Sequence, residues 1–363
     1  MTAILLKNRI SPLARLNQML GSRAYNNSRF FILVDKNTYS NCLPLLISKV
    51  SRLQEAEFFE VPAGEEAKSI EIASQLWFSL LDSQADRHSV IVNLGGGSVS
   101  DLGGFVAAGY KRGIRYINIP TSLIGMADAA IGGKTGINLA DCKNSVGFFH
   151  NPDITCIEPD FLETLPHHEL LSGIFELLKT LIISSPKLYT QFCDKLSGGT
   201  INLTDLPISH CVQFKQAVAK TDPKEAGIRL ILNFGHTFGH AIESFSHQQS
   251  KPYSHGISVG LGMLCALYLS TKKTGLPESV LTAYLQLLQT LLPNQMPVYS
   301  LADTEQILSF MRNDKKNAND EILCVLLQEP GAPIINVSIT ENEVRDTLLS
   351  LFKSAKTATP RKK

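Results

Sequence analysis

The chain has 363 residues, of which 44% are hydrophobic and 18% are charged. These proportions are typical of a globular protein and exclude an intrinsically disordered one. Lysine and arginine (34 together) nearly balance aspartate and glutamate (33), so the net charge of +1 gives no general basis for nucleic-acid binding. At this length we expect a large core and two domains.

The cysteines and the amino-terminal residues indicate in which cellular compartment the protein is expected. The seven cysteines are scattered and include no C-x-x-C pair, which favours reduced thiols over a disulfide framework. The apolar stretch at residues 3–6 is too short for a secretory h-region. No window approaches the about 20 apolar residues of a membrane span. We therefore expect a cytoplasmic protein with no membrane or nucleic-acid partner.

Short apolar runs alternate with helical spacing in the first half of the chain. Strands are predicted at residues 30–35, 58–61, 89–94 and 116–119, and helices at 70–81 and 107–110. This alternation predicts an α/β domain over residues 1–160, with a parallel sheet and a Rossmann-like nucleotide site at the carboxyl ends of its strands.

The second half changes character and predicts a mostly α-helical domain over residues 161–363. Amphipathic helices are predicted at residues 169–184, 208–220, 236–245, 257–273, 279–291 and 304–312, and one strand at 321–328. We expect the active site in the cleft between the two domains, where ligand sites are common.

Three glycines, Gly95, Gly96 and Gly97, follow the clearest predicted strand and open a helix. Glycines let a backbone approach a phosphate closely, and the N–H groups of a helix start point at it. The spacing is not the usual G-x-G-x-x-G, so a plain tight turn is the alternative. Asp101 is expected either to bind a ribose or nicotinamide group or to cap the helix.

A second glycine-rich loop at residues 131–136 carries Lys134, and Lys143 and Asn144 follow it. Two lysines and an asparagine on loops suit a phosphorylated or multiply hydroxylated substrate. A solvated lysine loop is the alternative. Lys215, Arg229 and the pair Lys315 and Lys316 add cations to the helical half, where each by itself is more often a surface charge.

Glu176 and Lys179 lie three residues apart on a predicted helix that is apolar all round. Buried charges need partners, so the simplest interpretation is an internal ion pair. The functional alternative makes Glu176 a carboxylate ligand of a metal ion.

Three histidines are the last group of candidate site residues. His236 and His240 lie four residues apart and share one face of a helix, and His255 follows 19 residues after His236. Neutral imidazole is a common metal ligand and a proton carrier near neutral pH. Hydrogen-bonded helix residues are the alternative. Glu176, His236 and His255 would form a two-histidine, one-glutamate set with an open coordination position.

These motifs together resemble the 3-dehydroquinate synthase family of sugar phosphate cyclases, from Pro62 to Gln328. The similar segments are P-A-G-E-E-A-K-S, G-G-G-S-V-S-D-L-G-G-F, Y-K-R-G, P-T-S-L, D-A-A-I-G-G-K-T-G, K-N, the E-x-x-K helix, G-I-R-L-I-L-N-F-G-H-T-F-G-H, H-G and D-K-K. The chain departs from the family pattern at Ser122, where threonine is usual, and at Cys142, where glycine is usual.

The resemblance implies a site, residue by residue. A divalent metal, zinc or alternatively cobalt, would be held by Glu176, His236 and His255. NAD would contact Asp35, Glu65, Lys68, Gly95, Gly96, Gly97, Asp101, Thr121, Ser122, Lys134, Lys143, Phe161, Leu162, Glu163 and Thr164. The substrate would contact Asp128, Lys134, Lys143, Asn144, Lys179, Lys215, Arg229, Asn233, His240, Lys315 or Lys316, and Arg112 from the second subunit of a homodimer. His240, Lys134, Lys179 and Asn233 would be catalytic.

The implied reaction converts 3-deoxy-D-arabino-heptulosonate 7-phosphate to 3-dehydroquinate and phosphate. It combines transient oxidation by NAD, phosphate elimination, reduction, ring opening and an intramolecular aldol closure. Cyclases that make valiolone or inosose rings are the nearest alternative. A metal-dependent alcohol or glycerol dehydrogenase and a catalytically silent sugar-phosphate binding protein are the others. The E-x-x-K helix and the G-H-T-F-G-H context favour a cyclase.

Overall fold

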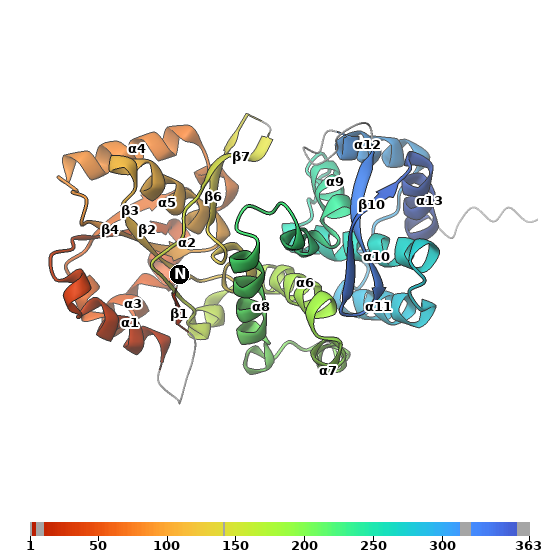
Figure 1. Ribbon diagram of the computed structural model, residues 1–363, viewed down its shortest axis with the longest axis horizontal. Coiled ribbons are helices and arrows are strands. Elements are labelled where there is room, and N and C mark those ends of the chain that lie inside the picture. Colours follow the sequence, from red (N-terminus) through yellow and green to blue (C-terminus); the bar gives the residue numbers. More distant parts are fainter. Residues whose placement is uncertain (1, 5–10, 141, 313–320, 354–363) are drawn as a thin grey trace, which may run out of the picture. The chain divides into compact units, whose positions relative to one another are not determined.

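The computed structural model describes residues 2–4, 11–140, 142–312 and 321–353. The chain divides into two units (Figure 1), called unit 1 and unit 2 below. Unit 1 comprises Met1–Gly173 and Ile208–Lys224, and unit 2 comprises Ile174–Pro207 and Glu225–Lys363. The division after Gly173 falls inside helix α6 (His167–Ser184), and the segment Ile208–Lys224 returns to unit 1.

Unit 1 is built on a six-stranded sheet in the order β1-β8-β5-β4-β2-β3, in which every strand pair is parallel. The strands are β1 (Thr2–Ile4), β2 (Phe30–Asp35), β3 (Glu57–Val61), β4 (Val90–Gly95), β5 (Arg115–Pro120) and β8 (Ile154–Cys156). Four of them confirm the predicted strands to within one residue at each end. The unbroken apolar runs of β2 and β4 are buried along their whole length, as expected for central parallel strands.

The strand order has a switch point between β2 and β4. After β2 the chain moves outward to β3, and it then returns to the other side of β2 to add β4, β5 and β8. In open α/β sheets, ligands bind outside the carboxyl ends of strands at such a point, because the connections diverge there. Asp35 ends β2 and Gly95 ends β4, so both predicted nucleotide residues lie at this switch point.

Helices cover the sheet of unit 1. They are α1 (Pro12–Leu20), α2 (Lys36–Asn41), α3 (Leu43–Lys49), α4 (Ile70–Asp82) and α5 (Gly97–Gly109). The last helix of unit 1, α8 (Ile208–Thr221), contacts the turn at Gly125–Ala129. Val99, Leu102 and Phe105 of α5 join the core that contains Phe31 of β2 and Ile91 of β4. The helix predicted to open at the glycine turn is α5, and it continues to Gly109 as predicted.

An antiparallel hairpin, β6 (Lys134–Leu139) with β7 (Cys142–Phe149), completes unit 1. The prediction that Lys134, Lys143 and Asn144 lie on loops was therefore wrong, since Lys134 begins β6 and the other two lie in β7. The side chains of β7 are exposed on almost every position, so the strand has no inward-outward alternation that sequence analysis can detect.

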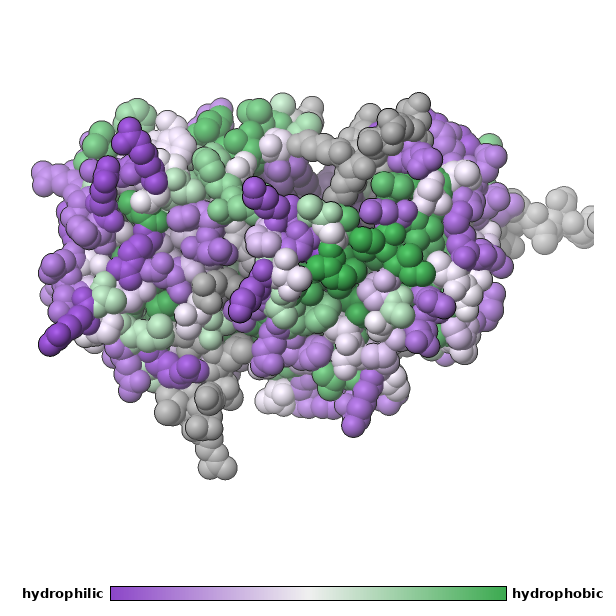
Figure 2. All heavy atoms as spheres, in the orientation of Figure 1, coloured by the Kyte–Doolittle hydropathy of each residue, from purple (hydrophilic) through white to green (hydrophobic). Residues whose placement is uncertain are grey.

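Unit 2 is mostly helical. Its helices are the larger part of α6, then α7 (Pro186–Leu196), α9 (His236–Ser246), α10 (His255–Lys273), α11 (Glu278–Leu291), α12 (Leu301–Arg312) and α13 (Glu341–Phe352). The single predicted strand is paired, because β9 (Ile322–Glu329) runs antiparallel to β10 (Ala332–Ile339). Figure 2 shows apolar side chains gathered on the face of unit 2 over α10 and β10. No helix among the described residues is long and apolar enough to cross a membrane.

Candidate functional site

The glycine turn of unit 1 joins β4 directly to α5. A Cβ on Gly95 would lie 2.5 Å from the Val99 side chain, so only glycine lets the helix begin at once. Gly96 is the N-cap residue, and a Cβ there would lie 3.2 Å from Ser122 Oγ. The Thr121 N–H donates to the Gly95 carbonyl at 3.0 Å. The structure thus brings Gly95–Gly97, Thr121 and Ser122 together at a helix start suited to a phosphate.

Asp35 lies at the neighbouring strand end and already has a structural role. Its Oδ1 accepts hydrogen bonds from the backbone N–H groups of Asn37 and Thr38, both at 2.9 Å, in a capping box that starts α2. The carboxylate is thereby held at the carboxyl edge of β2, beside the glycine turn.

A buried lysine organises the adjacent side chains, which we call the Lys68 cluster (Glu65, Lys68, Asp101, Asn138 and Asn144). Lys68 Nζ lies 2.8 Å from Asp101 Oδ2 and 3.8 Å from Glu65 Oε2, and it donates a hydrogen bond to Asn144 Oδ1. Burial raises the pKa of Asp101 and outweighs the opposing effect of the Lys68 ammonium. Burial would also raise the pKa of Glu65, but Lys68 and Asn138 lower it overall.

Sequence analysis did not identify Asn138 of the Lys68 cluster. Its Nδ2 donates to Glu65 Oε2 at 3.0 Å, its Oδ1 accepts from the Asn144 N–H at 2.9 Å, and its own N–H donates to the Lys68 carbonyl at 2.8 Å. Asn144 has a left-handed backbone (φ 50°), a conformation that asparagine tolerates better than most residues. Asn138 therefore ties the hairpin to the segment that carries Glu65 and Lys68.

The remaining predicted residues of unit 1 are spread over several elements. Lys215 of α8 bonds both Asp128 Oδ1 (2.7 Å) and the Asp128 carbonyl (2.8 Å) in the short π-helical turn η5 (Gly125–Ala129). Arg112 ends the short helix η4 (Tyr110–Arg112) with φ 66°. In η6 (Pro159–Thr164), Phe161 and Leu162 are buried, whereas Glu163 and Thr164 are exposed. Lys134 and Lys143 are exposed on the hairpin.

Unit 2 holds a second group of polar residues, which we call the histidine cluster (Glu176, Lys179, His236, His240 and His255). The nearest ring nitrogens of the three histidines all lie within 4.8 Å of one another. Glu176 Oε1 lies 3.4 Å from His255 Nε2 and 3.8 Å from His236 Nε2. Donor atoms of a tetrahedral zinc site lie about 3.3 Å apart, as bond lengths near 2.0–2.1 Å require, so these positions suit a small cation.

Close helix packing produces this convergence. A Cβ on Gly262 of α10 would lie 2.1 Å from the carbonyl oxygen of Gly235, and a Cβ on Gly239 of α9 would lie 3.0 Å from the Val259 Cα. Small residues at these points let α9 and α10 approach until the His236 and His255 rings are 5.5 Å apart. Phe175 of α6 packs against Gly260 of α10, which brings Glu176 to the same place.

The carboxylate of Glu176 is both buried and charged. It forms an ion pair with Lys179 at 2.6 Å, and both side chains are 1% exposed. Burial would raise the pKa of Glu176, but the Lys179 ammonium and the His255 ring together hold it well below its ordinary value. Among the described residues, Glu176 Oε1 has no hydrogen bond. An anionic oxygen that faces two imidazoles fits a metal ligand.

Hydrogen bonds set which ring nitrogens face Glu176. His236 Nδ1 lies 3.3 Å from the Phe234 carbonyl and His255 Nδ1 lies 2.9 Å from Glu243 Oε2, so each Nδ1–H donates to an oxygen. The two Nε2 atoms therefore face Glu176 and would be the ligand atoms offered to a metal ion. This arrangement, a protonated Nδ1 and a metal-facing Nε2, is usual for metal-bound histidine.

The other predicted residues of unit 2 lie in or near η8 (Ile228–Asn233), which precedes α9. Arg229 is 2% exposed, and Asn233 Nδ2 donates to Glu225 Oε1 at 2.8 Å. Sequence analysis missed Glu225 and Glu243 because an isolated glutamate carries no recognisable pattern. The predicted substrate residues Lys315 and Lys316 lie outside the described residues.

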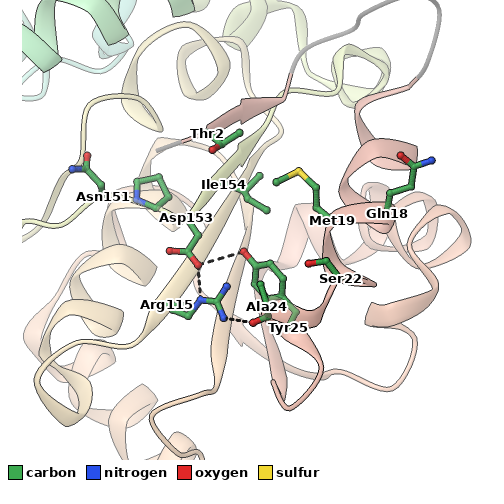
Figure 3. A pocket seen from close by; sticks show the side chains of 11 residues that line it. Thr2, Gln18, Met19, Ser22, Ala24, Tyr25, Arg115, Asn151, Asp153 and Ile154 are labelled. Carbon is green, nitrogen blue, oxygen red and sulfur yellow. Dashed lines mark hydrogen bonds and ion pairs between the residues drawn. The ribbon is translucent and has the colours of Figure 1, made fainter.

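A hollow of about 700 Å³ on unit 1 contains none of the predicted residues (Figure 3). Its Arg115 bonds Asp153 Oδ2 at 2.5 Å and stacks 3.9 Å above the Tyr25 ring. These groups satisfy one another, which is the behaviour of a structural ion pair.

Comparison with known proteins decides the family. The model of the 3-dehydroquinate synthase N-terminal domain matches residues 58–172, and that of the C-terminal domain matches residues 173–317. The chain belongs to the 3-dehydroquinate synthase family. A member of this family, the 3-dehydroquinate synthase of Parabacteroides distasonis, is 38% identical over 339 residues, which cover 92% of this chain and 94% of the relative.

Solved structures support the fold of this family member. A 2-deoxy-scyllo-inosose synthase complexed with carbaglucose-6-phosphate, NAD+ and Co2+ has a TM-score of 0.82 at 23% identity, covering 93% of this chain and 94% of its own. The 2-epi-5-epi-valiolone synthase ValA of Streptomyces hygroscopicus subsp. jinggangensis 5008, with NAD+ and Zn2+ bound, has a TM-score of 0.78 at 26% identity and the same coverage. The predicted fold class, an α/β domain followed by a mostly helical one, is confirmed.

Proposed function

We propose that the protein is a 3-dehydroquinate synthase, a lyase that converts 3-deoxy-D-arabino-heptulosonate 7-phosphate to 3-dehydroquinate and phosphate in the shikimate pathway. The similarity to the P. distasonis synthase over nearly the whole of both chains carries this proposal. The glycine turn with the Lys68 cluster in unit 1 and the histidine cluster in unit 2 support it. The reaction serves the biosynthesis of chorismate and aromatic amino acids.

Unit 1 would bind NAD, and unit 2 would hold a divalent metal. Zinc is the expected metal and cobalt is the alternative. Gly95–Gly97, Thr121 and Ser122 would receive the pyrophosphate, while Asp35 and the Lys68 cluster would flank the rest of the nucleotide. Glu176, His236 and His255 would hold the metal. When bound, NAD would supply reversible hydride transfer, and the metal would supply charge that acidifies a substrate hydroxyl.

The substrate is a small anion with a carboxylate and a phosphate. Different cations of the site would bind each of these two groups. Arg229 and Lys215 would hold the carboxylate, because a guanidinium fork matches a planar anion. Lys134, Asn144 and a lysine of the pair Lys315–Lys316 would hold the phosphate. Asp128 would keep Lys215 oriented through the contacts at 2.7 and 2.8 Å.

His240 would move protons rather than bind the metal. Its ring centroid lies 5.2 Å from that of His236 and 5.8 Å from that of His255, so it stands next to the metal ligands. Positioned acid-base groups contribute about 10²–10⁴-fold to a rate. Lys179 would keep Glu176 ionised, and Asn233 would be oriented by Glu225.

We further propose a homodimer in which Arg112 of each copy reaches the phosphate site of the other. Arg112 is exposed and has a left-handed backbone at the end of η4. We also propose a cytoplasmic location, which the seven free cysteines support.

Phosphate release from 3-deoxy-D-arabino-heptulosonate 7-phosphate tests the function, with catalytic NAD+ and zinc and with or without a chelator. We expect one phosphate per substrate, chelator sensitivity and no net NADH. Release of phosphate from a seven-carbon sugar phosphate without a carboxylate, but not from this substrate, would favour a valiolone-type cyclase. Steady NADH production from an alcohol would instead indicate a dehydrogenase.

A further inference from the structure

Glu243 lies on the same face of α9 as two members of the histidine cluster. Positions 236, 240 and 243 are separated by four and three residues, so their side chains form one row along the helix. The side chain of Glu243 is 10% exposed, and its Oε2 lies 2.9 Å from His255 Nδ1. A buried carboxylate in this position needs a specific partner, and the imidazole N–H supplies it.

His255 depends on such a contact more than His236 does. It is the first residue of α10, where Ser254 provides no side-chain cap, and its side chain is 37% exposed. The side chain of His236 is 11% exposed, and its Nδ1–H donates to the backbone carbonyl of Phe234, two residues earlier. Packing and backbone therefore orient His236, whereas a carboxylate from another helix orients His255.

We propose that Glu243 is a positioning residue for the metal centre. Its carboxylate accepts the Nδ1–H of His255, fixes the ring so that Nε2 faces Glu176 Oε1 at 3.4 Å, and increases the electron density at Nε2. Glu243 itself stays off the metal, because its oxygen is on the far side of the imidazole ring. This inference rests on the proposed metal-dependent function.

Metal affinity tests the role separately from catalysis. Zinc and cobalt dissociation constants would be measured by competition with a chromogenic chelator for the full-length protein and its Glu243→Gln and Glu243→Ala variants. Loss of a carboxylate that accepts a hydrogen bond from a metal-bound histidine typically weakens metal binding by about 10–100-fold. We expect about 10-fold weaker binding for Glu243→Gln, which keeps an acceptor but no charge, and about 100-fold for Glu243→Ala. Glu278→Gln, an exposed glutamate at the start of α11, is the matched control and should bind like the parent.

Two further readouts exclude a purely structural effect. The visible absorption of the cobalt-loaded Glu243→Gln variant should change in position or intensity, since one ligand is differently oriented. Its thermal unfolding without metal and its NAD affinity should match the parent. Unchanged metal affinity and an unchanged cobalt spectrum in both Glu243 variants would overturn the inference. If the parent protein itself bound neither metal, the proposed function would fail instead.

Discussion

The Lys68 cluster of unit 1 and the histidine cluster of unit 2 each surround a buried charged side chain, Lys68 or Glu176, but they are built differently. The Lys68 cluster draws on four separate segments, and its lysine ammonium satisfies two carboxylates and an amide at once. The histidine cluster comes from three helices, and the Glu176 oxygen and two Nε2 atoms in it face one another at 3.4 and 3.8 Å. The first cluster is complete as a structural unit, whereas the second is arranged for a cation.

The largest expected effect comes from removing one histidine at a time. His236→Ala should reduce phosphate release to background and abolish zinc retention, because it deletes a metal ligand. His240→Ala should retain zinc and lose about 10²–10⁴-fold in turnover number, because it deletes an acid-base group. Zinc content by elemental analysis and turnover by phosphate release check both variants. Loss of zinc in His240→Ala would assign the metal to the three histidines in place of Glu176.

Replacing each buried lysine tests whether only one cluster accepts a cation. Lys68→Met and Lys179→Met each leave a buried carboxylate without its ammonium, which costs about 3–5 kcal/mol of unfolding free energy. Zinc should restore part of the stability of Lys179→Met, because it places positive charge beside Glu176. It should restore none for Lys68→Met. Urea unfolding with and without zinc measures this, and equal rescue of both variants would contradict the distinction between the clusters.

Helix packing behind the histidine cluster can be loosened without changing a polar side chain. Gly262→Ala would place a methyl group 2.1 Å from the Gly235 carbonyl oxygen, so α9 and α10 must separate. We expect about 1–3 kcal/mol of destabilisation and weaker zinc binding. Gly198→Ala is the matched control, because a Cβ there meets no atom within 4 Å. Its unfolding free energy should stay within about 0.5 kcal/mol of the parent.

The smallest effect is expected for an exposed group of charges in unit 2. Solvent weakens the attraction between charges there, whereas burial strengthens it around Lys68 and Glu176. A hydrogen bond from Arg312 lowers the pKa of Glu341 to about 2, with help from Arg345. The folded pKa lies below the unfolded value, so this stabilisation is present above about pH 4.5 and is lost as pH falls toward 2. Because the group is exposed, we expect under about 1 kcal/mol. Glu341→Gln should remove this part of the pH dependence in unfolding measurements, and 1 M salt should weaken it.

Sequence analysis succeeded where a residue pattern has one physical cause. The apolar runs of β2 and β4 favour buried strands of a parallel sheet, and the glycines after β4 leave room for the start of α5. It failed for the β6–β7 hairpin, because the exposed face of β7 has no alternation. It also failed for Asn138, Glu225 and Glu243, because each is an isolated polar residue whose partner lies on another element.

The sequence by itself determined the parallel sheet, the glycine turn, the helical second half and the spacing of His236, His240 and His255, because these depend on residues close together along the chain. It also identified the family through the order of its polar motifs. Only the tertiary structure decided that α9 and α10 touch at glycines, that Glu243 holds His255, and that Asn138 joins Glu65 to Asn144. Those contacts join residues on different elements, and only the packing of the elements brings the residues together.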